Sequence, residues 1–198
     1  MATLDEFKAN LIGGGARANQ FRVTFNTPGA IATGLDVRKT SFLIKAAQLP
    51  GQELGEIAIP FRGRNLYIAG DREFATWDTT VINDTDFMVR NGIERWLNAI
   101  NDTATNTGLP NVADYTADLI VEQLDRDDTV LKSYILRSCF PQSTAAIDLS
   151  YETTNAIEEF TVTWRYTHFE ASAVNLSLIH ISEPTRQEAI SYAVFCLK

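Results

Sequence analysis

The sequence predicts a mainly β protein, an antiparallel β-sandwich or barrel with one flanking α-helix. Three observations indicate this class. Segments of alternating apolar and polar residues recur along the chain, most regularly over 20–26 and 157–169. Several of these segments are joined by short connections with turn-forming residues, which favours antiparallel neighbours. One segment, 85–100, instead repeats its apolar residues with helical spacing.

The N-terminal region combines an arm with a first strand. Residues 1–15 are expected to form a flexible arm, in which Leu4, Phe7 and Leu11 have helical spacing and a run of three glycines (13–15) serves as a joint. The segment QFRVTFN (20–26) alternates between apolar residues and Arg or Thr. We predict that it is a half-buried strand.

The next strand signals extend to residue 70. SFLIKAAQLP (41–50) is predicted to be a second strand that ends at Pro-Gly. GEIAIPF (55–61) and NLYIAG (65–70) are predicted to form a hairpin with a bulged turn at residues 62–64. Pro60 cannot donate to a ladder, so its strand is expected at an edge or a bulge.

A long strand over 73–83 and a helix are expected next. The helix is predicted to begin at Thr85 or Asp86, because an acidic side chain suits a helix N-terminus. The loop 101–111 is expected to follow it. The helix has one apolar stripe, formed by Val89, Ile93, Trp96, Leu97 and Ile100.

The rest of the chain is expected to be strand. ADLIVEQLD (117–125) and TVLKSYILRSCF (129–140) form a predicted second hairpin, with Asp-rich turn chemistry between them. AIDLSY (146–151) and IEEFTVTWRYTHF (157–169) are the last predicted strands. We therefore expect about eight strands and one helix in a single domain, residues 1–175.

Residues 176–198 are expected not to be native protein. LSLIHISEPTR and ISYAVFCLK in this stretch resemble the in-frame translation of a sequencing-library adapter, and residues 187–189 lie where a sample index would fall. A short native C-terminal helix is the alternative. We exclude the stretch from the fold prediction and expect that the native C-terminus is cut short.

Composition and charge exclude several classes of protein. The 198 residues are 45% hydrophobic and carry a formal net charge of −8, so the chain lacks the excess of basic residues that is typical of nucleic-acid-binding proteins. No apolar run approaches the length needed to span a membrane and no signal-peptide pattern is present, which predicts a soluble, cytoplasmically made protein without membrane contact. Cys139 and Cys196 match neither a disulfide framework nor a metal site, and no cofactor is predicted.

The acidic stretch IAGDREFATWDTTVIND (68–84) raises the possibility of catalysis. Glycosidases need two acids that face each other across a cleft. Asp78 and Asp84 are an even distance apart on one predicted strand, so they are expected to share a face, and Asp71 is expected in a turn. His168 has no nucleophile or second histidine at usable spacing and is expected at a surface or interface. The protein is predicted not to be an enzyme.

Several segments together resemble the T4-like bacteriophage tail tube protein family. The most specific is GDREFATWDTTVIND, preceded by FRGRNLYIA and AAQLPG. ARANQFRVTF, NDTDFMVRNGIERWLNAI and IEEFTVTWRYTHFE also match. Together they cover nearly all of residues 16–170 in the family's order, whereas 176–198 departs from the family.

This resemblance implies a structural virion protein. Its subunits would close into hexameric rings in which each copy contributes strands to a continuous inner barrel, and the rings would stack into the inner tube of a contractile phage tail. Implied partners are further copies of the chain, the tail sheath and baseplate proteins, and DNA that passes without tight binding during ejection. Assembly would take place in the host cytoplasm. A net-negative channel lining is expected, because a lumen that lets DNA slide should not bind phosphate.

The resemblance also suggests contact residues. The hairpin 50–70 is expected to join one ring to the next, and solvated arginines on an exposed loop are the alternative. Its expected contact residues are Arg62, Arg64, Asp71 and Arg72. The polar faces of strands 73–83 and 157–167 are expected to meet the lumen or a neighbouring subunit through Asp78, Asp84, Thr161, Thr163 and Arg165.

Other functions are alternatives to the main tube. A tube-initiator or baseplate protein, or the tube protein of a secretion system, would have the same fold. A carbohydrate-active β-sandwich would need exposed aromatic residues beside paired acids. Trp77, Trp96 and Trp164 instead lie at core positions of their predicted elements.

Overall fold

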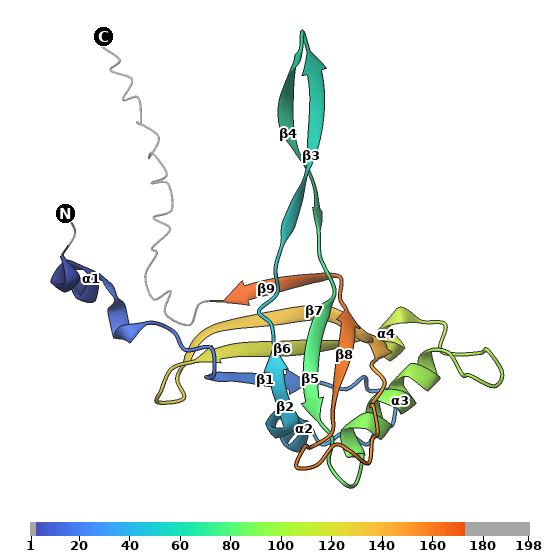
Figure 1. Cartoon of the computed structure of the whole chain (residues 1–198). Helices are drawn as coiled ribbons and strands as arrows, with labels where there is room; N and C mark the ends of the chain where they lie inside the picture. The colour runs from blue at the N-terminus through green and yellow to red at the C-terminus, as the bar shows by residue number, and fades with distance from the viewer. Residues whose placement is uncertain (1–2, 173–198) are drawn as a thin grey trace, which may run out of the picture.

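The structure, a computed structural model, describes residues 3–172 (Figure 1). The expectation for 176–198 therefore falls outside the described residues. The elements in chain order are α1 (Leu4–Asn10), the short 3-10 helix η1 (Ile12–Gly14), β1 (Phe21–Phe25), α2 (Val37–Leu43), β2 (Ile44–Ala47), β3 (Glu53–Phe61), β4 (Arg64–Glu73), β5 (Trp77–Ile82), α3 (Met88–Ile100), α4 (Val112–Tyr115), β6 (Ala117–Leu124), β7 (Val130–Thr144), β8 (Glu159–Arg165) and β9 (His168–Ser172).

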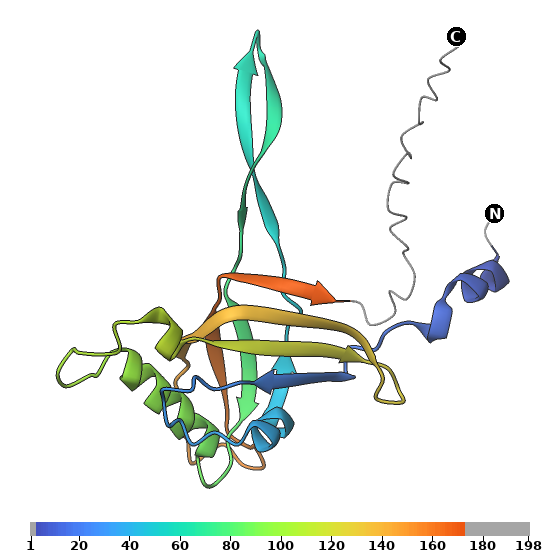
Figure 2. The ribbon, with the colours of Figure 1, turned by 180° about the vertical axis from the view of Figure 1, so that it is seen from behind.

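The body is one antiparallel seven-stranded sheet that folds into two layers. Its strand order is β1-β6-β7-β8-β5-β2, and β9 pairs with β7. Strands β1, β6, β7 and β9 run crosswise to β2, β5 and β8 (Figures 1 and 2). The predicted mainly β, antiparallel class is confirmed. Because β1 and β2 each pair with one strand only, the sheet is not closed within the described chain.

Strand β7 joins the two layers because a bulge bends it. Its first part pairs with β6 and β9, and its last part, Phe140–Thr144, pairs with β8. The register slips beside Ser138, whose φ is 54°. Asp118 holds this bulge, since its carboxylate accepts hydrogen bonds from Ser138 N at 3.0 Å and from Arg137 Nη1 at 2.5 Å. A bulge of this kind lets one strand turn the corner of a sandwich.

The core lies between the layers and under α3. The predicted helix stripe is confirmed, with Val89, Ile93 and Trp96 buried. Trp96 and Phe25 meet the Trp164 ring edge to face, with ring centroids 5.6 and 4.8 Å away. Each tryptophan N–H has an acceptor, so these large side chains are buried without an unpaired donor.

The first correction concerns 41–50, which was predicted to be all strand. The structure forms α2 first and gives β2 only four residues. Asp36 caps α2, because its carboxylate accepts hydrogen bonds from Arg38 N at 2.9 Å and Lys39 N at 3.1 Å. This cap, upstream of the apolar run, outweighs the strand pattern over Ser41–Leu43.

The predicted long strand 73–83 and the start of the following helix are also corrected. Asp71 is inside β4, which runs to Glu73, and β5 begins only at Trp77. Helix α3 begins at Met88, two residues beyond Asp86, because Phe87 has a left-handed backbone with φ 53°. Asp86 still accepts a hydrogen bond from Met88 N at 3.0 Å.

The C-terminal strands differ from prediction as well. Residues 146–151 form no strand, and Leu149 and Tyr151 are exposed. The segment 157–169 divides into β8 and β9, because the chain turns at Thr167, whose N–H donates to Arg137 O at 3.1 Å. β9 then continues along the same edge of β7 as β8, since the pair Arg137–His168 follows directly on the pair Phe140–Arg165. Among the described residues, no helix is long and apolar enough to cross a lipid bilayer.

Candidate assembly surfaces

The hairpin β3–β4 extends from the body as an isolated pair of strands (Figure 1). It continues the neighbouring strands β2 and β5. Its turn has two residues, Arg62 and Gly63, both with positive φ (46° and 84°), as a tight hairpin turn requires. The hairpin prediction is confirmed, but the register shift lies at the base, between Leu54 and Glu56, and not in the turn.

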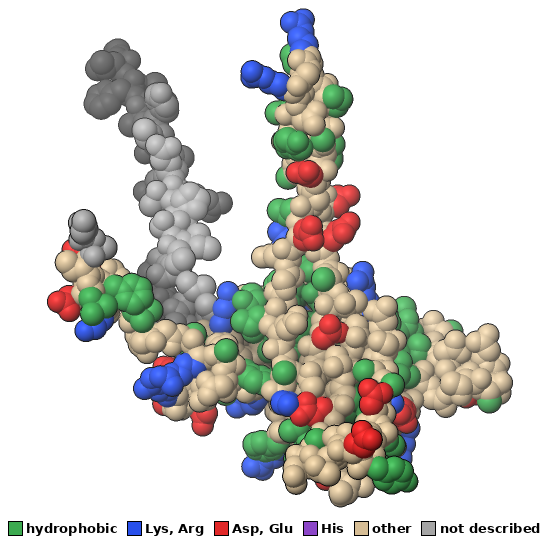
Figure 3. All heavy atoms as spheres, viewed as in Figure 1, with side chains coloured by type: hydrophobic (Ala, Val, Ile, Leu, Met, Phe, Trp, Pro, Cys, Tyr) green, Lys and Arg blue, Asp and Glu red, His purple; other side chains and the backbone are tan. Residues whose placement is uncertain are grey.

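One face of this hairpin is strongly apolar. The register places Ile57 opposite Ile68, Ile59 opposite Leu66, and Phe61 opposite Arg64, and directly opposed residues share a face. The five apolar side chains are 43–67% exposed, and Figure 3 shows hydrophobic side chains along the hairpin. We call Ile57, Ile59, Phe61, Leu66 and Ile68 the hairpin apolar face. The sequence prediction missed it, although the alternation of Ile57, Ile59 and Phe61 was a visible signal.

The four predicted contact residues do not form one cluster. Arg62 and Arg64 lie at the tip, where the Arg62 guanidinium is 5.3 Å from the centre of the Phe61 ring. Asp71 and Arg72 lie at the base, and Arg72 Nη1 donates to Gln52 Oε1 at 2.9 Å. Figure 3 accordingly shows basic side chains at the tip and acidic ones lower on the hairpin. The tip and the base of the hairpin therefore differ in charge.

The two strands of the hairpin approach closely near its base. A Cβ on Gly70 would lie 3.1 Å from the Gly55 backbone. Because glycine has no side chain, the strands can cross at this point, and the hairpin twists strongly (Figure 1).

Strands β5 and β8 carry the predicted polar face. Asp78 is opposite Thr163, and Thr80 is opposite Thr161. The alternate residues, such as Trp77 and Val162, are buried in the core. Arg165 follows in the same phase, and its Nη1 donates to Phe74 O at 3.3 Å. Asp78, Thr161, Thr163 and Arg165 therefore belong to one sheet face.

Asp84 does not belong to that face. β5 ends at Ile82, and the carboxylate of Asp84 pairs with Lys39 Nζ at 2.8 Å. Lys39 also pairs with Asp86 at 2.5 Å. Hydrogen bonds from Lys39 lower the pKa of both carboxyl groups, and these two partners raise the pKa of Lys39. The expectation that Asp78 and Asp84 share a strand face is wrong, because the strand stops before Asp84.

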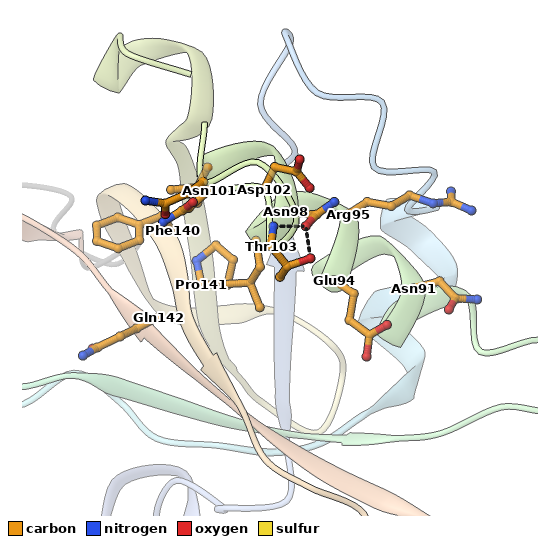
Figure 4. Close-up of a pocket in the computed structure, with 13 residues that line it drawn as sticks. Asn91, Glu94, Arg95, Asn98, Asn101, Asp102, Thr103, Phe140, Pro141 and Gln142 are labelled. Atoms are coloured by element: carbon orange, nitrogen blue, oxygen red, sulfur yellow. Dashed lines mark hydrogen bonds between the residues drawn. The ribbon is translucent and has the colours of Figure 1, made fainter. Parts of the chain in front are cut away.

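A groove lies between α3, the loop after it and the bend of β7 (Figure 4). Its volume is about 970 Å³. Phe140 and Pro141 contribute apolar surface, and Asn98 holds the loop by accepting hydrogen bonds from Thr103 N at 3.1 Å and Thr103 Oγ1 at 3.4 Å. Glu94, on the rim, is paired with Arg90 Nε at 2.7 Å. The sequence prediction did not identify this groove, because it is formed by segments far apart in the chain.

Two further titratable residues, Cys139 and His168, were considered as candidates in the sequence. Cys139 is buried, and burial raises the pKa of its thiol to about 12. His168 lies on β9, 4.0 Å from Glu170. Within residues 3–172, no group of three His, Cys, Asp or Glu side chains is arranged to hold a metal ion.

Comparison with known proteins gives consistent results. Residues 16–172 match the family model described as phage tail tube protein. The tail tube protein of Serratia phage KSP90 is 32% identical over 168 residues, which cover 84% of this chain and 95% of that protein. Tail tube protein gp19 of Enterobacteria phage T4 is 28% identical over 156 residues, covering 78% and 91%.

Solved structures share the fold at low sequence identity. A chain of the anti-feeding prophage baseplate has a TM-score of 0.59 and 15% identity, with 82% of this chain and 98% of that chain covered. A chain of the extended PVC sheath–tube complex, an extracellular contractile injection system, has a TM-score of 0.52 and 13% identity, with 88% and 100% covered.

Proposed function

The chain belongs to the phage tail tube protein family, and we propose that its copies form hexameric rings that stack into the inner tube of a contractile phage tail. In this role the protein is a structural component of the tail and provides the conduit for DNA ejection. Further copies of the same chain are then its main partners.

The hairpin apolar face is the observation that best supports stacking. An isolated two-stranded hairpin has little stability in water, and this one leaves five large apolar side chains exposed. Burying this surface against another copy would remove apolar area from water at about 25 cal/mol per Å². We therefore assign the hairpin, with Arg62 and Arg64 at its tip, to the contact between successive rings.

The open sheet supports closure between copies within a ring. The outer edges of β1 and β2 have no strand partner among the described residues. Unpaired edges attract other strands, and a ring covers them when each copy places an edge beside its neighbour. We propose that strands of adjacent copies join in this way into an inner barrel.

The polar face of β5 and β8 is our candidate for the channel lining. Threonine side chains dominate it, with Asp78, Glu159 and Arg165 as charged members. A lining without net positive charge would let DNA pass without tight phosphate contacts, in agreement with the net charge of −8. A density map of the assembled tube in which basic side chains dominate the lumen would contradict this assignment.

The outer surface would contact other tail proteins. The solved relatives come from a baseplate and from a sheath–tube complex. We propose that this chain likewise meets sheath and baseplate proteins, after assembly in the host cytoplasm.

Electron microscopy tests the proposal. We expect the purified chain, and the same chain truncated after Asn175, to form six-membered rings or hollow tubes. The double variant Arg62→Glu/Arg64→Glu should lose tubes and retain the fold. A matched control with the same charge change, Arg38→Glu/Arg126→Glu, alters two exposed arginines outside the hairpin and should assemble normally. A stable monomer would contradict the proposed function, and tubes formed by the hairpin variant would contradict the role of the tip.

A further inference from the structure

The N-terminal helix α1 has an apolar stripe that no other part of the described chain covers. Leu4 and Phe7 on α1 and Leu11, its C-cap residue, have the i, i+3, i+7 spacing of one helix face, and they are 68%, 63% and 44% exposed. No residue of α1 is buried. Figures 1 and 2 show the helix away from both the body and the hairpin.

Although short, α1 is well defined at its start. Thr3 and Glu6 form a capping box, in which Glu6 N donates to Thr3 Oγ1 at 3.3 Å and Thr3 N donates to Glu6 Oε2 at 2.8 Å. The three following glycines have φ values of 64°, 76° and 83°. A capped helix on a glycine joint can be presented to a surface that the body of its own chain does not provide.

The stripe of α1 and the hairpin apolar face match in length. The distance along the helix from Leu4 to Leu11 is about 10 Å at 1.5 Å per residue. The three rows of the hairpin apolar face extend from Ile57 to Phe61, about 13 Å at 3.3 Å per residue. About two turns of helix would therefore cover these rows.

The charged residues of α1 and of the hairpin favour one orientation of the helix on the hairpin apolar face. Asp5 and Glu6 lie in the first turn of α1, and Lys8 lies in the last turn. The hairpin has Arg62 and Arg64 at its tip, and the pair Glu53 and Glu73 lies at its base. A helix whose N-terminus points to the tip brings opposite charges together at both ends.

We propose that α1 of one copy docks on the hairpin apolar face of a second copy, with its N-terminus toward the hairpin tip. This inference rests on the proposed function and names the surface that the hairpin meets. α1 and the hairpin are different surfaces. A copy that uses one of them in a contact therefore still has the other free to bind a further copy. Such a head-to-tail contact propagates along a stack of rings and does not end at a dimer.

Crosslinking in mixed assemblies tests the contact. In a Cys196→Ser background, one preparation carries Lys8→Cys on α1 and the other carries Ile57→Cys on the hairpin apolar face. The two are mixed under tube-forming conditions and treated with a short bismaleimide. We expect a crosslinked dimer of about twice the 22.0 kDa of the chain. Ala58→Cys, next along β3 on the opposite hairpin face, is the matched control and should give little dimer.

Each outcome decides the inference. Tubes that form without a Lys8–Ile57 crosslink would overturn the docking and leave the proposed function intact. Equal yields of crosslinked dimer with Ile57→Cys and Ala58→Cys would have the same consequence. A Lys8→Cys/Ile57→Cys chain that crosslinks within itself, when diluted in copies that carry only Cys196→Ser, would assign α1 to its own hairpin and also overturn it. Failure of the unmodified chain to form tubes would remove the proposed function and the inference together.

Charge exchange provides a second test. Arg62→Glu/Arg64→Glu is expected to lose tubes, and adding Asp5→Arg should restore them, because the attraction at the tip is recovered. Asp5 is preferable to Glu6, which belongs to the capping box. Asp127→Arg, an exposed acid in the β6–β7 turn, is the control that should not restore assembly. Equal rescue by both would overturn the docking direction.

Discussion

Trp164 Nε1 donates a hydrogen bond to Thr79 Oγ1 at 3.0 Å, and both side chains are buried where β5 and β8 pair. The contact joins the polar hydroxyl of one strand to the largest side chain of the other. It explains why a threonine is located at a core position between Trp77 and Val81. The hydroxyl is needed as an acceptor, because a buried indole N–H without one is costly.

Thr79→Val should lower the free energy of unfolding by about 1–3 kcal/mol, because the Trp164 N–H loses its acceptor while the volume stays nearly the same. Chemical denaturation followed by tryptophan fluorescence measures the change. Thr80→Val is the matched control, since Thr80 is the next residue along β5 and belongs to the polar face. Equal effects of the two substitutions would show that the hydrogen bond is unimportant.

Gly108→Ala should destabilise the protein by at least about 1–3 kcal/mol, the usual cost of overpacking. A Cβ at this position would lie 1.9 Å from the carbonyl oxygen of Ile100, so the loop after α3 would have to move. Gly29→Ala is a suitable comparison, because nothing lies within 4 Å of a Cβ there. Thermal unfolding of both variants checks this, and an unchanged melting temperature for Gly108→Ala would contradict the close approach.

Lys39→Gln should lower the melting temperature at pH 7, and the difference from the original protein should shrink as the pH falls. Hydrogen bonds from Lys39 lower the pKa of Asp84 and Asp86 in the folded protein. Carboxyl groups with a lowered folded pKa stabilise the protein above their unfolded value of about 3.9, and this contribution is lost as the pH falls through the folded pKa.

The melting temperature should therefore be measured from pH 7 down to about pH 2, below the usual range for these carboxyl groups. Arg126→Gln in the β6–β7 turn is the control, because Arg126 is exposed and has no ion pair among the described residues. A difference for Lys39→Gln that persists unchanged at the lowest pH would mean that its effect is not due to the carboxylates.

Cys139 should resist alkylation in the folded protein. Burial raises the pKa of its thiol from an ordinary 9.0 to about 12, so thiolate is about a thousandfold rarer. In a Cys196→Ser background, iodoacetamide at pH 8 should modify Cys139 slowly until denaturant is added, as followed by mass spectrometry. Rapid modification of the native protein would show that the β6–β7 layer opens readily.

The local sequence pattern was sufficient to predict the elements that have one exposed and one buried face. The alternation in β1 and β8, the stripe of α3 and the core positions of Trp77, Trp96 and Trp164 were all predicted, because period and burial follow from the same side chains. The β3–β4 and β6–β7 hairpins were predicted because their turns lie between adjacent segments. The antiparallel sheet class followed from these elements.

Prediction failed where a residue outside the predicted segment decides the structure of that segment. Asp36 caps α2 and converts the start of an apolar run from strand to helix. The C-terminal alternation was treated as one strand, but it breaks at Thr167, where β8 and β9 follow the bend of β7 along one edge. Asp84 was placed on the same face as Asp78, although Lys39, 45 positions earlier in the chain, holds it elsewhere.

By itself, the sequence determined the antiparallel β class, the hairpin with arginines at its tip and the resemblance to tail tube proteins, because each depends on residues that are close together in the chain. Only the tertiary structure decided how these parts are arranged. It bends β7 at Ser138 so that one sheet forms two layers, and it separates Asp71 and Arg72 from the hairpin tip. It also leaves the hairpin apolar face uncovered by the body. The reason is physical: whether an apolar side chain is core or interface depends on which surfaces the rest of the chain brings to it, and periodicity alone does not contain that information.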